Sequence, residues 1–478
     1  MLFTTPLFLL AFLPAFLLAY FLVRGTRLRN VVALAFSMLF FAWGEPVFVW
    51  YVVAGTAIDY VFIKQVFFRR DLGEGAKRLG LAVAIAINVG ALLFFKYANF
   101  FVDQFQPLLA TTGWSRPAWY PVVLPLGISF IAFHKISFLV DLYKQRIAPP
   151  ASFVGALLYI LFFPQLVAGP IIRYHEIREQ IESRSTGPDD VLGGFVRFAR
   201  GLARKALIAD PAGIVASSVF ALPPESLPFH VAWIGVVGYT IQIYFDFSGY
   251  SDMAIGLARI VGFRFPENFN QPYTACSVTD FWRRWHMTLS NWMRLYLYVP
   301  LGGNRVAPWR LYLNLWIVFL VSGFWHGAAW TFIAWGAYYG FFLTAEKFCE
   351  RRGWDLPVPR VVKQALTFLV VVNAWVLFRA DSLDYAARLI ARMYGLLPQS
   401  RPSPEPFALI FQPIGLAAIG VGLLLALVPL PTVLRRVAAI KDSEAFDAIR
   451  WASGAALFLV ALASVLASGT STFLYFRF

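Results

Sequence analysis

Apolar runs of about twenty residues recur along this chain, and short clusters of arginine and lysine separate them. Each run is long enough to cross a bilayer as a helix. Charged residues make up 14% of the 478 residues, whereas a soluble globular domain carries about 25%. We therefore expect an all-α, polytopic integral membrane protein. The sequence predicts one domain over 1–478 that ends in an aromatic tail at 471–478.

The formal net charge of +15 does not indicate a nucleic-acid partner, because the cations lie in short loops between apolar runs. In that position they orient helices and contact anionic membrane lipid. Cys276 and Cys349 show no metal or redox spacing. We expect no metal site and no permanently bound cofactor.

The basic clusters also predict the orientation of the chain in the membrane. Clusters at 24–29 and 69–78 flank one hairpin and are cytoplasmic by the positive-inside rule, which places the N-terminus outside. The cluster at 435–450 likewise places the C-terminus outside. The sequence predicts about eleven transmembrane spans, at 2–23, 31–43, 47–66, 79–102, 121–142, 229–247, 309–325, 328–345, 362–379, 406–429 and 451–469.

Three further segments do not fit a simple span. The apolar run 151–170 has basic residues on both sides, so we expect a re-entrant pair of half-helices broken near Pro164 or Gly169. Residues 186–207 predict an amphipathic helix on the inner surface. The stretch 281–300 is rich in tryptophan and carries three arginines, which suits a protein-lined cavity better than lipid.

Two of the five histidines share a local setting, because His286 and His326 each follow a tryptophan in an apolar, aromatic segment. An ionisable group at membrane depth suggests function, and a neutral imidazole suits a general base. Gly323 and Gly327 would let a substrate or another helix approach His326. For His326 the alternative is a structural histidine that hydrogen-bonds a neighbouring helix. For His286 the alternative is one member of a polar network with its arginine neighbours.

Other polar residues in apolar surroundings have two readings. Asp246 and Asp252, beside Ser248, could orient a histidine, pair with Arg283 or Arg284, or line a polar path. A buried ion pair between helices is the structural alternative. Gln165 could line a tunnel or satisfy backbone groups freed by prolines. Asn304 and Arg305 suit a loop at a cavity mouth or a simple turn.

The remaining histidines, His134, His175 and His230, are expected to be structural or exposed. The tail STFLYFRF suggests an interfacial anchor. Alternatively, it folds back and presents the Tyr475 hydroxyl to the histidine pair.

Taken in order, these motifs resemble the membrane-bound O-acyltransferase family, and most closely its bacterial alginate O-acetyltransferase branch. The matching segments are FAWGEP (41–46), PLGISF (125–130), FPQLVAGPI (163–171), YFDFSGYSDMAIG (244–256), FWRRWHMTLSNW (281–292), YVPLGGNR (298–305), SGFWHG (322–327) and FLYFRF (473–478).

The resemblance implies a ring of helices around a central tunnel and funnel. It makes His326 the catalytic residue, His286 its partner, and Tyr475 the residue that relays the acyl group. The expected funnel and tunnel residues are Asp246, Ser248, Asp252, Arg283, Arg284, Trp285, Asn291, Asn304, Trp325 and Gln165.

The resemblance also implies a donor and partners. The donor would be a cytoplasmic thioester, either acetyl-CoA or an acyl carrier protein. A periplasmic SGNH-type acetyltransferase would pass the acetyl group to an exported polysaccharide. The location would be the bacterial inner membrane. Peptidoglycan or cellulose acetylation, D-alanyl or lipid acyl transfer, and a polysaccharide transporter remain as alternatives.

Overall fold

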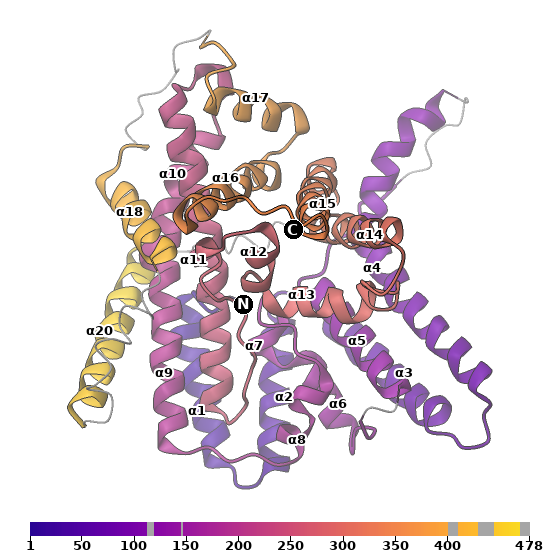
Figure 1. The fold of residues 1–478 in the computed structure, drawn as a ribbon. Coiled ribbons are helices and arrows are strands. Elements are labelled where there is room, and N and C mark those ends of the chain that lie inside the picture. The colour runs from indigo at the N-terminus through magenta and orange to yellow at the C-terminus, as the bar shows by residue number, and fades with distance from the viewer. Residues whose placement is uncertain (112–118, 145–146, 400–409, 429–443, 469–478) are drawn as a thin grey trace. The chain divides into compact units, whose positions relative to one another are not determined.

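The computed structural model describes residues 1–111, 119–144, 147–399, 410–428 and 444–468, and these form helices and loops without a strand (Figure 1). The all-α prediction is confirmed for these residues. They group into two compact units: unit 1 is 1–194 with 254–266, and unit 2 is 195–253 with the chain from 267 onward. The expectation that 1–478 acts as one domain stays a prediction.

Unit 1 contains most of the N-terminal helices. Its π-helical turns are η1 (Phe8–Phe12) and η2 (Ile63–Phe67). Its α-helices are α1 (Leu13–Leu22), α2 (Thr26–Ala42), α3 (Phe48–Phe62), α4 (Glu74–Ala110), α5 (Ile128–Tyr143), α6 (Phe153–Leu161), α7 (Phe163–Leu166) and α8 (Tyr174–Glu182).

The predicted span 121–142 begins late, because α5 starts only at Ile128. Pro121 and Pro125 disfavour a helical conformation in the residues before them. Gly127 then takes φ +72°, and a Cβ there would lie 2.8 Å from the Leu166 carbonyl oxygen. The turn before α5 therefore requires glycine.

The apolar run 151–170 is broken, as expected. α6 begins at the Ser152 cap, whose hydroxyl accepts from the Gly155 amide at 3.1 Å. It ends at Leu161, and Phe162, with ψ 113°, separates it from the short α7. The break thus comes two residues before Pro164. The Gln165 amide donates to the Tyr159 carbonyl, which supports its structural role.

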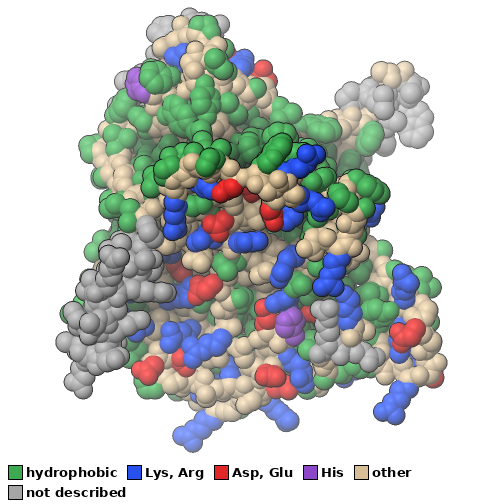
Figure 2. All heavy atoms as spheres, in the orientation of Figure 1, with side chains coloured by type: hydrophobic (Ala, Val, Ile, Leu, Met, Phe, Trp, Pro, Cys, Tyr) green, Lys and Arg blue, Asp and Glu red, His purple; other side chains and the backbone are tan. Residues whose placement is uncertain are grey.

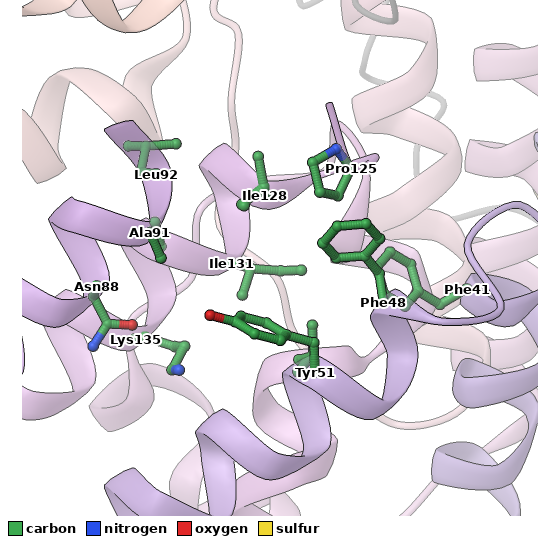
Figure 3. Close-up of a pocket in the computed structure, with 12 residues that line it drawn as sticks. Phe41, Phe48, Tyr51, Asn88, Ala91, Leu92, Pro125, Ile128, Ile131 and Lys135 are labelled. Carbon is green, nitrogen blue, oxygen red and sulfur yellow. The ribbon is translucent and has the colours of Figure 1, made fainter. Parts of the chain in front are cut away.

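A small cavity of about 50 Å³ lies within unit 1 among α3, α4 and α5 (Figure 3). Figure 3 shows Tyr51 extending toward Asn88 and Lys135. Lys135 Nζ pairs with the buried Asp59 carboxylate at 3.2 Å. The space suits one or a few waters, and the ion pair ties α3 to α5.

A half-buried ion-pair cluster connects two segments of unit 1. Asp190 accepts from Arg264 at 2.5 Å and from Arg259 at 3.5 Å. Partial burial would raise the pKa of Asp190, but the hydrogen bond and charge of Arg264 outweigh it and hold the pKa below its usual value. The segment 254–266 is thereby tied to the start of α9 (Pro188–Ala203).

The predicted amphipathic helix at 186–207 is present and continues further than expected. α9 runs through the π-helical η3 (Arg204–Ala209) into α10 (Asp210–Phe220) without a break. At 1.5 Å per residue this run is about 50 Å long. Its first half carries Arg197, Arg200 and Arg204, and its second half is mostly apolar apart from Lys205 and Asp210.

Unit 2 contains the remaining helices, and α11 extends from unit 2 into unit 1. The α-helices are α11 (Phe229–Ile260), α12 (Val278–Arg284), α13 (Met287–Met293), α14 (Pro308–His326), α15 (Trp330–Arg351), α16 (Arg360–Arg379), α17 (Leu383–Met393), α18 (Pro413–Leu427) and α20 (Glu444–Ser468). Short turns are η4 (Pro224–Ser226), η5 (Pro272–Thr274) and η6 (Arg294–Tyr298).

Membrane character is evident in the described helices. Glu74–Gln106, Arg360–Arg379 and Ala448–Ser468 are long and apolar enough to cross a bilayer, and Phe8–Leu22 and Pro413–Leu427 are apolar but shorter. Large hydrophobic side chains such as Val47 and Leu22 are more than 70% exposed. On the face in Figure 2, hydrophobic side chains are exposed over broad areas. The number of spans and the central tunnel stay predictions.

Candidate active site

His286 lies at a sharp break between two short helices of unit 2. α12 ends at Arg284, α13 begins at Met287, and His286 has φ 43° and ψ 54°, in the left-handed region. The loop 268–270 holds this break through two backbone hydrogen bonds. Asn270 N donates to Arg284 O, and Met287 N donates to Asn268 O, each at 2.9 Å. The conformation is therefore fixed from both sides.

The hydrogen bonds of Asn268 determine the tautomer of His286. The Thr288 amide donates to Asn268 Oδ1 at 3.3 Å, and a backbone N–H can only donate, so this atom is the amide oxygen. His286 Nδ1 lies 3.0 Å from the same oxygen and must carry the proton. In the neutral ring, Nε2 then holds the lone pair. His286 is fully buried, and its Nε2 accepts no hydrogen bond from any described residue.

Asn268 itself is held by α11. Its Nδ2 donates to Ser251 Oγ at 3.0 Å, and both side chains are buried. Sequence reasoning missed Asn268, Ser251 and Thr288. The one signal was the polar loop PENFNQPY, which precedes the Trp-rich stretch. Nothing in that loop's pattern says which asparagine turns inward.

His326 is the last residue of α14 and is 4% exposed. Its ring packs against three aromatic rings, with centroid distances of 4.7 Å to Trp325, 4.9 Å to Trp335 and 5.2 Å to Phe378. These rings come from α14, α15 and α16. The WHG motif therefore places the histidine in an aromatic cage rather than facing lipid.

The glycines beside His326 allow α14 and α15 to approach closely. A Cβ at Gly323 would lie 2.4 Å from the Phe332 carbonyl oxygen, and one at Gly327 would lie 2.1 Å from the Phe332 ring. Gly336 of α15 is equally tight against the Phe319 carbonyl oxygen. Of the two roles expected for Gly323 and Gly327, the structure shows the approach of another helix.

A series of ring contacts links the two histidines within unit 2. His286 contacts Phe247 at 4.7 Å. The contacts continue through Trp285 and Trp375 to Phe378, which contacts His326. The expected site residue Trp285 thus belongs to the wall that joins the histidines.

Buried donors lie next to this wall. Trp335 is 1% exposed, and its Nε1 has no hydrogen-bond partner among the described residues. The same holds for Trp282 Nε1 and the Tyr339 hydroxyl. Burying a polar group without a hydrogen-bond partner is costly. These three donors are therefore suited to hydrogen-bonding a polar ligand.

Asp246 and Asp252 form ion pairs that hold helices together, which matches the structural alternative. Asp246 Oδ1 lies 2.7 Å from Lys205 Nζ, and both side chains are nearly fully buried. Asp252 pairs with Arg197 at 2.9 Å and with Arg204. Sequence reasoning did not identify these partners, because they lie on another helix.

The other expected residues are spread over different environments. Arg284 pairs with Asp280 at 2.9 Å, four residues away, rather than with an α11 carboxylate. Ser248 is buried, and its hydroxyl has no hydrogen-bond partner among the described residues. Arg283, Asn291, Asn304 and Arg305 are exposed, and Trp325 is buried. Gln165 lies in unit 1, and Tyr475 lies outside the described residues.

A carboxylate that sequence analysis missed caps α12. Glu346 of α15 accepts from the Val278 and Thr279 amides and from the Thr279 hydroxyl, at 2.5, 2.9 and 2.7 Å. A negative charge at a helix N-terminus is stabilising. Glu346 therefore fixes the helix that leads into His286.

The other histidines have different surroundings. His134 is buried in unit 1 and accepts from the Ile172 amide at 3.2 Å. His175 and His230 are exposed, and His175 contacts Asp141. The described residues bring no three metal-binding side chains together.

The sequence is similar to proteins of known class. A profile of the membrane-bound O-acyltransferase family matches residues 79–381. A probable alginate O-acetylase of Pseudomonas putida is 40% identical over 82% of this chain and 80% of its own length. A peptidoglycan O-acetyltransferase of Helicobacter pylori is 34% identical over the whole chain and 98% of its own length. A teichoic acid D-alanyltransferase of Bacillus subtilis is 28% identical over 52% of the chain and 66% of its own length. The chain belongs to the membrane-bound O-acyltransferase family.

Proposed function

We propose that this acyltransferase O-acetylates an exported polysaccharide, and an alginate-like polymer first of all. Its similarity to alginate O-acetylases supports this substrate class. In the proposal, acetyl-CoA or an acyl carrier protein supplies the acetyl group from the cytoplasm. A periplasmic SGNH-type transferase passes the group to the polymer. The protein acts in the bacterial inner membrane with both termini in the periplasm.

The observation that carries the chemistry is the buried His286–His326 aromatic cluster in one unit. His326 removes the proton from the attacking hydroxyl as its oxygen forms a bond with the thioester carbonyl carbon. The tetrahedral intermediate collapses by breaking the C–S bond. The proton passes from the imidazolium to the departing sulfur, so an ester and a thiol are the products.

The hydrogen-bond pattern assigns different tasks to the neighbouring groups. Because neutral His286 presents a lone pair at Nε2, it suits accepting a hydrogen bond from another bound donor group better than donating to an oxyanion. The single proton of the attacking hydroxyl goes to His326. The Trp335 indole N–H, buried beside His326, is the donor we propose for the oxyanion. Tyr475 is proposed to receive the acetyl group on its way to the partner.

The test is base-labile acetate on exported and surface polysaccharides at matched protein levels. His326→Ala should abolish it, whereas the control His230→Ala, at an exposed histidine, should leave it unchanged. Loss in Tyr475→Phe as well supports the tyrosyl relay, and retention returns the tail to an anchor role. Normal acetate in His326→Ala would refute the proposed chemistry.

Peptidoglycan is the second candidate polymer. The Helicobacter pylori peptidoglycan O-acetyltransferase matches the chain over its whole length, including the C-terminal tail. The same assay separates the two candidates, because acetate is lost from one polymer and kept on the other.

A further inference from the structure

Unit 2 contains a groove of about 540 Å³ that lies outside the histidine cluster. One wall is a single face of the continuous α9–η3 helix, from Arg200 through Arg204 to Ile208. The facing wall is a single face of α18, from Ile414 to Leu425, and Leu457 of α20 completes the lining. Both walls follow the spacing of one helical stripe.

The groove has one apolar part and one cationic end. Its α18 wall consists of isoleucine, alanine, valine and leucine, whereas Arg200 and Arg204 lie at the start of the opposite wall. Val421 is 49% exposed. Such a surface suits an amphiphile with an apolar chain and an anionic head.

At the cationic end, one arginine is in an ion pair and the other is not. Arg204 is committed to Asp252. Arg200 is exposed and forms no ion pair or hydrogen bond with any described residue. The like charges of Arg450, Arg204 and Arg197 act on it and outnumber the one opposite charge, that of Asp252. An anion placed between these guanidinium groups would relieve their repulsion.

We propose that this groove binds an anionic phospholipid, with one acyl chain along α18 and the phosphate at Arg200. A neutral lipid could fill the apolar part but would leave the arginines uncompensated. Basic pockets between helices on the cytoplasmic side are known to suit anionic headgroups. The site is independent of the acyl-transfer chemistry.

The experiment measures lipid bound to the purified full chain by native mass spectrometry. The protein is exchanged into micelles that contain equal amounts of phosphatidylglycerol and phosphatidylcholine. The parent should retain phosphatidylglycerol preferentially. Arg200→Gln should reduce that preference about fivefold, the effect of one basic residue at a membrane surface.

A second variant tests the apolar part. Val421→Trp fills the groove from an exposed position and should lower retention of both lipids. Leu424→Trp is its control, because Leu424 is 59% exposed on the same helix but does not line the groove. Arg351→Gln is the control for the lost charge. Equal retention of the two lipids by the parent, or unchanged retention in both Arg200→Gln and Val421→Trp, would overturn the proposal.

Discussion

Replacing Lys205 by methionine should destabilise unit 2 strongly while leaving the transfer chemistry intact. Lys205 Nζ and Asp246 Oδ1 are 2.7 Å apart, and the two side chains are 3% and 2% exposed. At an effective dielectric constant near 20, their attraction is about 6 kcal/mol. Desolvation of both ions offsets much of this, but loss of Lys205 removes the cation that faces the buried Asp246 carboxylate and also the partner of Asp210, 2.5 Å away. The expected loss of stability is about 3–5 kcal/mol.

The double variant Lys205→Met/Asp246→Leu separates structure from chemistry. It removes both buried charges and leaves Asp210, whose side chain is 25% exposed, in contact with solvent, so it should recover most of the lost stability. The free energy of unfolding is measured by titrating SDS into mixed micelles, and acetyl transfer is measured per folded molecule. A double variant as unstable as the single one would refute the charge argument. A stable but inactive double variant, beside a Lys205→Met variant that is active per folded molecule, would show that Asp246 acts in the chemistry.

Three further predictions concern the site. Asn268→Asp keeps the acceptor for His286 Nδ1 but stabilises the imidazolium. As the pH is lowered, the variant should therefore lose activity at a higher pH than the parent does. An unshifted pH profile would contradict the assigned tautomer. Trp335→Phe removes only the indole N–H and part of the ring, and should lower kcat by about 10²-fold or more. The control is Trp282→Phe, because Trp282 contacts the Trp335 ring. This control should have a much smaller effect on kcat. Glu346→Ala uncaps α12 and should cost about 1–2 kcal/mol of stability, seen in the same SDS titration, with an intact unfolding midpoint arguing against the cap.

The long apolar helices were predictable, because burial in lipid requires continuous apolar runs. The helix that contains the predicted span 229–247 is longer than that span, since α11 continues to Ile260 through both of its aspartates. From the sequence, we predicted that Asp246 and Asp252 lie at the end of a span. Lys205 and Arg197 neutralise them from another helix, and such partners leave no trace in local periodicity.

The site was predictable to a similar extent. His286 and His326 stood out because ionisable groups are rare in apolar segments, and the structure places both in one buried cluster. Asn268 and Glu346 act through contacts 18 and 67 residues away in sequence. No short motif contains both partners of either contact, so tertiary structure was needed to find them.

The left-handed backbone at residue 286 also limits which amino acids evolution can place there. A β-branched side chain is strongly disfavoured at φ 43°, and most other residues lose about 1–2 kcal/mol. Asparagine, aspartate and glycine tolerate this conformation best. In a lineage that no longer needs the imidazole, residue 286 should therefore be replaced most often by one of these three residues. The backbone would preserve the position's geometry after its chemistry had changed.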